Sequence, residues 1–205
     1  MQKGKNMNYL MFNGVKYILA AEEENERTVE DTNTILHGIK EAETCKIGKW
    51  EFIVCEHTGE GTVLLMKDCL YEREIFGSNN NYNGSNVDTL CEKFADELAT
   101  VVGAENIIIH TVDLTADDGL RDYGSIERRV SLFTANQYRK YVDILDKHRL
   151  DKWTWTATAY STPKHDGDCW VKCVAPRGFI CNFHCNFTFG VRPFCILKSN
   201  IFVSK

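Results

Sequence analysis

The chain has 205 residues, of which 43% are apolar and 26% charged, and its formal net charge is −5. A chain of this length buries enough surface to fold without covalent staples, and no apolar run approaches the ~20 residues that a membrane-spanning helix needs. These numbers argue against a membrane span, and the acidic balance argues against a nucleic-acid partner.

The first 14 residues contain neither a continuous apolar segment nor a small-residue cleavage site, so we expect no secretory signal peptide. The nine cysteines, an odd number, then indicate reduced thiols instead of a disulfide framework. Five of these cysteines lie within residues 169–205, a stretch that also carries five basic residues and no acid.

The N-terminal part begins with a predicted hairpin. Two apolar runs, residues 9–12 and 15–19, flank Asn13-Gly14, a dipeptide that favours a two-residue turn. Residues 22–33 are acidic and polar with no apolar period, which predicts a solvated helix or connector. We therefore treat residues 1–44 as an N-terminal hairpin and acidic connector. A second hairpin is predicted from residues 50–55 and 62–66, with its turn at Gly59 and Gly61.

Two amphipathic helices are predicted in the middle of the chain. Asp88 as N-cap and Gly103 as terminator bracket the first, and Thr134 with Gln137 forms a capping box that opens the second. Their apolar positions recur at helical spacing: Leu90, Cys91, Phe94, Leu98, Val101 and Val102, then Tyr138, Tyr141, Ile144 and Leu145. Short strands are expected at residues 107–109 and 131–133, with a turn-rich loop over 113–125. From residue 153 onward only short strands and loops are expected, so the fold class is α+β.

Thiol chemistry is one candidate function. The spacing of five C-terminal residues permits a zinc site, but no second tidy ligand pair accompanies it, so we expect unliganded thiols. These residues are Cys169, Cys173, Cys181, His184 and Cys185. A thiolate–imidazole pair of Cys195 with His165 or His184 lacks any local nucleophile signature.

Calcium binding is another candidate. The acidic turns at residues 113–119 and 166–168 are rich in oxygen ligands, but neither matches the alternating calcium loop, and aspartate in turns more often caps the backbone. Asn83 and Asn186 fall in glycosylation acceptor patterns, which carry little weight without a secretory signal. We expect no cofactor, no bound metal and no enzymatic activity.

Residues 177–190 depart from any regular strand or helix pattern. Four phenylalanines, two cysteines and a histidine lie among asparagines. An exposed aromatic binding surface accounts for this composition better than a buried strand pair, because aromatic side chains offer large contact area at small entropic cost. Residues 173–197 also contain no Lys, Glu, Gln, Met or Trp. Codons of the form NNC cannot encode these five residue types, so randomisation of both adenines in AAC codons accounts for the segment.

Four stretches carry a resemblance to a known family: residues 50–54, 110–119, 153–158 and 190–197. The W-x-W-T-A-T entry and the G-V-R-P ending are its most specific parts. Over residues 45–205 the chain resembles a domain family of gut Firmicutes and their phages that is related to the C-type-lectin-like fold of formylglycine-generating enzymes. Some members resemble variable proteins of diversity-generating retroelements, in which reverse transcription with errors at adenines rewrites the 3′ end of the gene.

The resemblance implies a C-type-lectin-like domain over residues 45–205 with a variable region at about 153–195. It implies scaffold roles for Trp155, Gly190, Arg192 and Pro193, with Gly190 relaxing a turn, Arg192 satisfying buried carbonyls and Pro193 limiting a strand. Because NNC does not encode tryptophan, Trp153 and Trp170 are also expected to be fixed. The variable face is expected to comprise Tyr160, His165, Asp168, Phe179, Cys181, Asn182, Phe183, His184, Cys185, Asn186, Phe187, Thr188 and Phe189.

A protein of this kind is expected to act as a receptor or adhesin for a protein or glycan on a cell surface. It would be made in the cytoplasm and reside in a phage virion or at a cell surface, and its aromatic patch also suits pairing into a homo-oligomer. Two alternatives stay open. One is a thiol or metal enzyme of the formylglycine-generating type, although Cys181 and Cys185 do not match the reactive context. The other is a structural phage protein in which Phe183, Phe187 and Phe189 are buried.

Overall fold

The computed structural model describes residues 9–12, 15–18, 33–165 and 167–205, and it divides the chain into two compact units, Met1–Asp31 and Thr32–Lys205. The first unit contains the predicted N-terminal hairpin, which is confirmed. In it β1 (Tyr9–Phe12) pairs antiparallel with β2 (Val15–Ile18). The turn at residues 13–14 and the predicted acidic connector up to residue 32 lie outside the described residues.

The second unit begins earlier than the expected boundary after residue 44. Strand β3 (Asn33–Ile35) pairs antiparallel with the last strand, β17 (Phe202–Ser204), which places Ile35 opposite Phe202. Because this pairing joins the start of the unit to its end, the boundary lies between residues 31 and 32.

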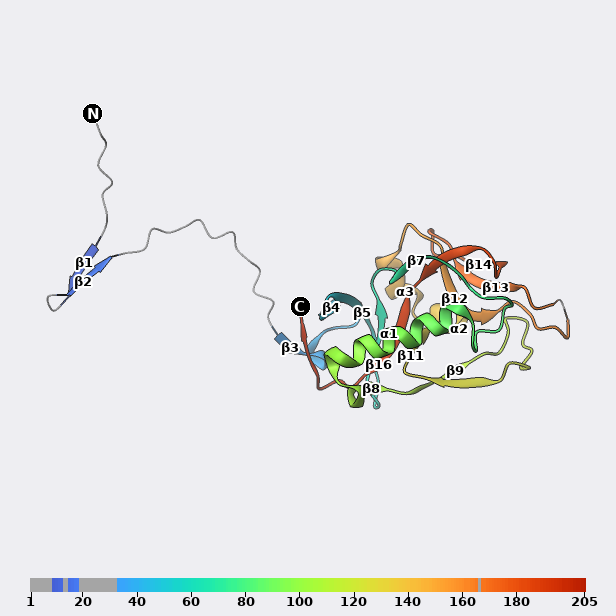
Figure 1. The fold of residues 1–205 in the computed structure, drawn as a ribbon, viewed down its shortest axis with the longest axis horizontal. Helices are drawn as coiled ribbons and strands as arrows, with labels where there is room; N and C mark the ends of the chain where they lie inside the picture. The colour runs from blue at the N-terminus through green and yellow to red at the C-terminus, as the bar shows by residue number, and fades with distance from the viewer. Residues whose placement is uncertain (1–8, 13–14, 19–32, 166) are drawn as a thin grey trace, which may run out of the picture. The chain divides into compact units, whose positions relative to one another are not determined.

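The second unit is a sheet-rich α+β fold built around two sheets (Figure 1). An eight-stranded sheet has the order β11-β16-β6-β5-β4-β17-β3, with β8 paired to β16, and a five-stranded sheet has the order β14-β13-β12-β15-β7. Strands β9 and β10 form a separate antiparallel pair. The remaining strands are β4 (Thr44–Ile47), β5 (Trp50–His57), β6 (Thr62–Met66), β7 (Tyr71–Ile75), β8 (Ile107–Ile108), β9 (His110–Asp113), β10 (Ser125–Arg128), β11 (Val130–Leu132), β12 (Thr154–Ala159), β13 (Trp170–Val174), β14 (Ile180–His184), β15 (Thr188–Val191) and β16 (Pro193–Leu197).

The second predicted hairpin, β5 with β6, is confirmed and lies at the centre of the larger sheet. Its successive side chains alternate between two apolar cores. Phe52 and Val54 point into the core under α1 (Asn86–Val102), whereas Ile53 and Cys55 point into the core under α2 (Ala135–Lys140) and α3 (Val142–Leu145). Since both faces of the middle of β5 are buried, residues 52–55 form a continuous apolar run instead of an alternating one.

Helix α1 matches the predicted first helix, but its N-cap lies three residues before the expected cap, Asp88. Ser85 is the N-cap, and its hydroxyl accepts the Asp88 backbone N–H. The Asp88 carboxylate instead pairs with the Arg128 guanidinium, with a shortest N–O distance of 2.7 Å. Gly103, with φ of +84°, ends the helix as predicted. Within the described ranges, no helix combines the length and the apolar character needed to cross a bilayer.

The second predicted helix is interrupted. Its capping box is confirmed, because the Thr134 hydroxyl and the Gln137 side chain each accept the other residue's backbone N–H. At Tyr141, however, the backbone leaves the helical region, and the chain continues as α3 and a 3₁₀ turn, Asp146–His148. The Tyr141 hydroxyl donates to the Glu56 carboxylate, and the Tyr141 ring stacks on Phe133. These contacts to other elements hold Tyr141 in a position that it would not occupy in an unbroken helix.

Arg192 lies at the point where the chain passes from one sheet to the other, between β15 and β16. The side chain is buried, and its guanidinium donates to the carbonyls of Met66 at 2.7 Å, Lys67 at 2.9 Å and His148 at 3.4 Å. This is the role in satisfying buried carbonyls that the resemblance implied. Pro193 directly follows as the first residue of β16, a position that needs no backbone donor.

Gly190 has a different role from the expected relaxed turn. It lies within β15, parallel to β12 and opposite Thr154, with no left-handed backbone angle. A β-carbon at this position would overlap the Cys69 sulfur and lie 3.2 Å from the Trp153 carbonyl oxygen. Glycine is therefore required here by close packing of neighbouring segments.

We expect Gly190→Ala to destabilise the second unit by about 1–3 kcal/mol through this overlap. Urea unfolding of the full chain measures the loss. Cys69→Ala removes the overlapping sulfur, so the double variant should be more stable than Gly190→Ala alone. If the two substitutions were simply additive, the sulfur contact would not be the cause.

His110, the first residue of β9, is buried against Phe194, and its Nε2 lies 2.9 Å from the Ser131 hydroxyl. Burial lowers the pKa of His110 from 6.5 to about 4, because the protonated ring would lose its hydration. The unfolded chain binds a proton at this ring below about pH 6.5.

The second unit should therefore be most stable above pH 6.5 and lose stability as the pH falls toward 4. Across this window the unfolded chain takes up a proton that the folded domain does not, and the loss reaches at most ~3 kcal/mol. Urea unfolding across the window checks this prediction. His110→Gln keeps a hydrogen-bonding side chain that does not titrate, and its stability curve should be flatter. An equally steep curve would assign the effect to other groups.

Candidate ligand-binding face

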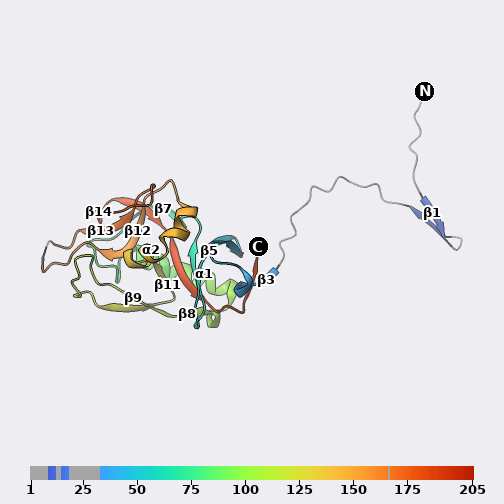
Figure 2. The same ribbon diagram turned by 180° about the vertical axis from the view of Figure 1, so that it is seen from behind.

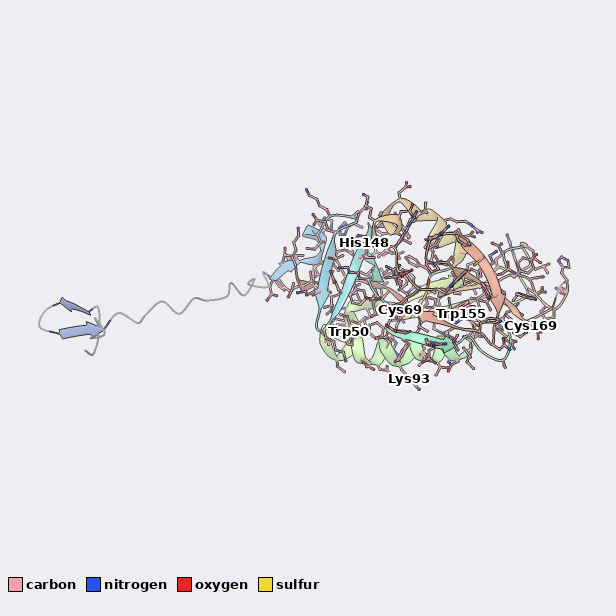
Figure 3. All side chains as sticks on the ribbon, turned by 90° about the horizontal axis from the view of Figure 1, so that it is seen from above. Trp50, Cys69, Lys93, His148, Trp155 and Cys169 are labelled. Atoms are coloured by element: carbon pink, nitrogen blue, oxygen red, sulfur yellow. The ribbon has the colours of Figure 1, made fainter. Side chains whose placement is uncertain are left out.

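The residues predicted to form a variable face lie mainly on β14, β15 and the turns beside them, and three lie in the connection between β12 and β13. Figures 1 and 2 show β13 and β14 at the end of the second unit opposite to β3 and the C-terminus. Strand β14 pairs only with β13 and so forms an edge of the five-stranded sheet. In Figure 3, Cys169, which directly precedes β13, lies near the same end of the unit.

The antiparallel register of β13 and β14 sorts their side chains onto two surfaces. Val171 opposite Phe183 and Cys173 opposite Cys181 lie on the side of the core under α1. The alternate pairs of this register, which include Trp170 with His184, lie on the opposite side of the sheet because side chains alternate along each strand. The predicted residues thus belong to two different surfaces.

The first surface, here called the aromatic margin, consists of Trp153, Phe179, Phe183 and Phe187 at the edge of the larger core. The Trp153 and Phe183 ring centroids are 5.0 Å apart, and those of Phe183 and Phe187 are 5.3 Å apart. Phe179 meets Trp153 edge-on at 6.2 Å. Phe179 and Phe187 remain 53% and 49% exposed, so the margin presents apolar rings to solvent at both ends of β14.

Two predicted members of the face are not on any surface. Phe189 is 9% exposed, with its ring 4.5 Å from that of Trp155. Cys185 is 2% exposed, its N–H donates to the Cys169 carbonyl at 2.7 Å, and its own carbonyl accepts the Phe76 N–H. These two positions therefore belong to the core, because the turn after β14 folds back between neighbouring segments.

The other predicted members around β14 retain solvent contact. Asn186, Phe187 and Thr188 are exposed in the turn and at the start of β15, and the side chains of β14 are half-buried. A purely structural segment requires Phe183, Phe187 and Phe189 to be largely buried. Phe189 is buried and Phe183 is half-buried, whereas Phe187 is 49% exposed and does not meet this condition.

The second surface, here called the polar face, consists of Tyr160, Trp170, Lys172, Asn182 and His184. Trp170 is 40% exposed and meets the His184 ring at 5.9 Å. The Lys172 ammonium lies 5.6 Å from the Tyr160 ring centroid. Trp170 also anchors this surface, since its carbonyl accepts the Tyr160 N–H. Aromatic rings, an amide and an imidazole therefore lie side by side on this surface.

Lys172 is buried and needs the carboxylate of Asp117, which lies 3.1 Å from its ammonium nitrogen. Arg139 donates to the same carboxylate at 2.8 Å. Burial alone would raise the pKa of Asp117, but the hydrogen bonds from Arg139 and Lys172 outweigh it and hold the pKa below its ordinary value. Sequence reasoning did not connect these residues. The one available signal was a lysine in the middle of an apolar strand, which requires a partner.

His165 and Asp168 lie in the loop between β12 and β13, and both are exposed. The His165 Nδ1 lies 3.3 Å from the Asp118 carboxylate, which also accepts the Ser161 hydroxyl at 2.7 Å. These hydrogen bonds join the loop to the turn-rich segment before β10. Asp118, considered above as a calcium ligand, thus already accepts hydrogen bonds from protein groups. Asp166 lies outside the described residues.

The C-terminal cysteines do not converge on a metal. The sulfur atoms of Cys173 and Cys181 lie 3.3 Å apart, and the Cys185 Sγ lies 3.9 Å from the His184 Nδ1. Among the described residues, no three His, Cys, Asp or Glu side chains are grouped as metal ligands. Cys195 is fully buried in β16, and burial raises its pKa, which disfavours a reactive thiolate.

One feature beside the face was not anticipated from the sequence. A hollow of about 460 Å³ is lined by the asparagine-rich loop at residues 77–86 and by Ile75 of β7. Ile75 is exposed and lies opposite Thr188 of β15, so the hollow adjoins the turn that carries Phe187. The polar Gly/Asn/Ser composition predicted a loop here, but its position beside β15 depends on a long-range strand pairing.

Models of known protein families, curated proteins and solved structures were each compared with the chain, and none of the three comparisons finds a match. The face therefore has to be interpreted from its own geometry.

Matched substitutions at neighbouring aromatic positions separate surface from core. We expect Phe187→Ala to change the free energy of unfolding by less than about 1 kcal/mol, because half of the side chain already faces solvent. Phe189→Ala, two residues on, should cost about 3–5 kcal/mol because it opens a cavity between Trp153 and Trp155. Urea unfolding of both variants measures the difference, and equal losses would contradict the assignment of Phe187 to the surface.

Proposed function

We propose that the second unit is a ligand-binding domain of the C-type-lectin-like type that displays a diversified surface on β14 and the turn after it. The observation that carries the proposal is the pair of half-exposed rings, Phe179 and Phe187, at the two ends of an edge strand with no charged residue. Contiguous exposed apolar patches, unlike single exposed apolar side chains, mark binding surfaces, and these two rings are joined through Trp153 and Phe183.

The distribution of buried and exposed residues supports diversification. Trp155, Gly190 and Arg192 hold the scaffold through buried contacts that do not involve the outward side chains of β14. Trp155 donates its indole N–H to the Glu74 carbonyl at 2.8 Å, for example. Residue types that NNC codons encode occupy the exposed positions from Arg177 to Thr188. Such a scaffold accepts new outward side chains while its core stays the same.

The chemistry of the surface suits a broad contact with a protein or a glycan on a cell surface. Phe179 and Phe187 provide apolar area, while Asn182 and His184 provide hydrogen-bonding groups without a fixed charge. Aromatic and amide side chains together are typical of binding surfaces that must adapt to different ligands. The chain enters the unit at β3, at the opposite end, so attachment there leaves β14 free.

The gene itself tests the proposal. Codons for Phe179, Phe183 and Phe187 should all end in C. A second, nearly identical copy of this region of the gene (the near-copy) should lie close by in the genome and carry AAC at those positions. At Phe189 and Phe194, which are buried, the near-copy should encode phenylalanine unchanged. A TTT codon at Phe183, or AAC in the near-copy opposite Phe194, would remove the main support for diversification.

Metal analysis of the purified protein separates this proposal from an enzyme on the same scaffold. A stoichiometric copper or zinc that is lost in Cys181→Ser would favour the thiol or metal enzyme. Retention of such a metal in Cys181→Ser would place it away from the edge strand.

A further inference from the structure

The antiparallel pairing of β13 with β14 brings two thiols into contact. Cys173 lies directly opposite Cys181 in the register, and their sulfur atoms are 3.3 Å apart. A disulfide bond is about 2.0 Å long, so a shift of little more than 1 Å separates this contact from a covalent bond. Both residues project toward the same side of the sheet, which is the orientation a cross-strand bond requires.

The two thiols differ in access to solvent. Cys173 is fully buried, whereas Cys181 is half-buried on the edge strand. Burial raises the pKa of Cys173, and the hydrogen bond with Cys181 raises it further. A dissolved reagent therefore reaches Cys181 first, and Cys173 lies behind it as the second thiol.

We propose that Cys173 and Cys181 form a reversible cross-strand disulfide by thiol–disulfide exchange with a low-molecular-weight disulfide. The Cys181 thiolate attacks one sulfur of the small disulfide, and the departing thiolate takes up the proton that Cys181 released. The Cys173 sulfur then attacks the Cys181 sulfur and displaces the second small thiol, which takes the proton of Cys173. Two protein thiols are oxidised, and one small disulfide is reduced to two small thiols.

Geometry makes this bond readily reversible. Directly opposite residues of antiparallel strands have β-carbons about 4.5–5.5 Å apart, whereas a relaxed disulfide prefers about 3.5–4.5 Å. The strands must therefore move together, and the resulting strain favours reduction. Among the described residues no strand pairs with the outer side of β14, so no second ladder opposes this movement.

The bond would tie β14, which carries Asn182, Phe183 and His184, covalently to its neighbour β13. Oxidation would thereby restrict the edge strand that forms part of the polar face and of the aromatic margin. This inference does not depend on the proposed ligand-binding function, since the thiol contact is present whether or not the surface binds anything.

The test uses the full chain, reduced, desalted and then incubated with oxidised glutathione under native conditions. Intact mass should fall by two hydrogen atoms with no glutathione retained. After blocking of free thiols, trypsin cuts after Lys172 and Arg177, which isolates Cys173 on residues 173–177. Chymotrypsin then cuts after Phe179, Phe183, Phe187 and Phe194, which places Cys181, Cys185 and Cys195 on separate peptides. The peptide with Cys173 should be linked to residues 180–183, which carry Cys181, and reduction should release it.

Two variants and one condition serve as controls. Cys185→Ala, matched in type and four residues away, should keep the linked peptide, whereas Cys181→Ala should abolish it. Cys173→Ala should stop at a glutathione adduct on Cys181. In urea the unfolded chain should give mixed pairings of its nine thiols, which shows that folding selects the pair.

Three results would overturn the inference, and each can be observed with the wild-type chain alone. They are a lasting glutathione adduct on Cys181, a link from Cys173 to Cys185 or Cys195, and no reaction of the folded chain. None of these results bears on the codon test of ligand-surface diversification, so the two proposals fail separately.

Discussion

A buried guanidinium at the crossing between two sheets holds the second unit together. The chain leaves β15 of the five-stranded sheet and enters β16 of the eight-stranded sheet with Arg192 as the only residue between them. Its donors satisfy the carbonyls of Met66, the last residue of β6, of Lys67 directly after it, and of His148 in the 3₁₀ turn. Without that side chain, three carbonyls at a buried junction would lose a hydrogen-bond donor, which is among the costlier defects that a fold can contain.

The candidate face depends on this junction indirectly. Strand β15 also runs parallel to β12, and the close approach at Gly190 keeps Trp153 and Trp155 against Phe189. These rings form the inner wall of the aromatic margin, on which the exposed phenylalanines rest. The margin therefore has a rigid interior and a solvent-facing rim, and only the rim is free to change.

Elements with local signals could be predicted from the sequence, and those set by distant contacts could not. The Asn-Gly hairpin, the Thr134 capping box and the Gly103 helix end all follow from neighbouring residues. The helix break at Tyr141 follows from Glu56, which lies 85 residues away. In the candidate face, composition drew attention to residues around β14, several of which the structure leaves partly exposed. The burial of Cys185 and Phe189 follows from long-range strand contacts that composition does not reveal.

Under the proposed diversification, the position of β14 at a sheet edge limits which codon products this strand can accept. Its ladder to β13 uses main-chain groups, which every residue except proline supplies in full. The side chains of an edge strand also have to pack against one neighbouring strand, whereas those of the central strand β12 have to pack against two. Of the residues that a randomised AAC codon encodes, proline, from CCC, is the one that the backbone itself rejects wherever its N–H is needed by β13. Selection on such a library would therefore act first through hydrogen bonding to β13, before any ligand is encountered.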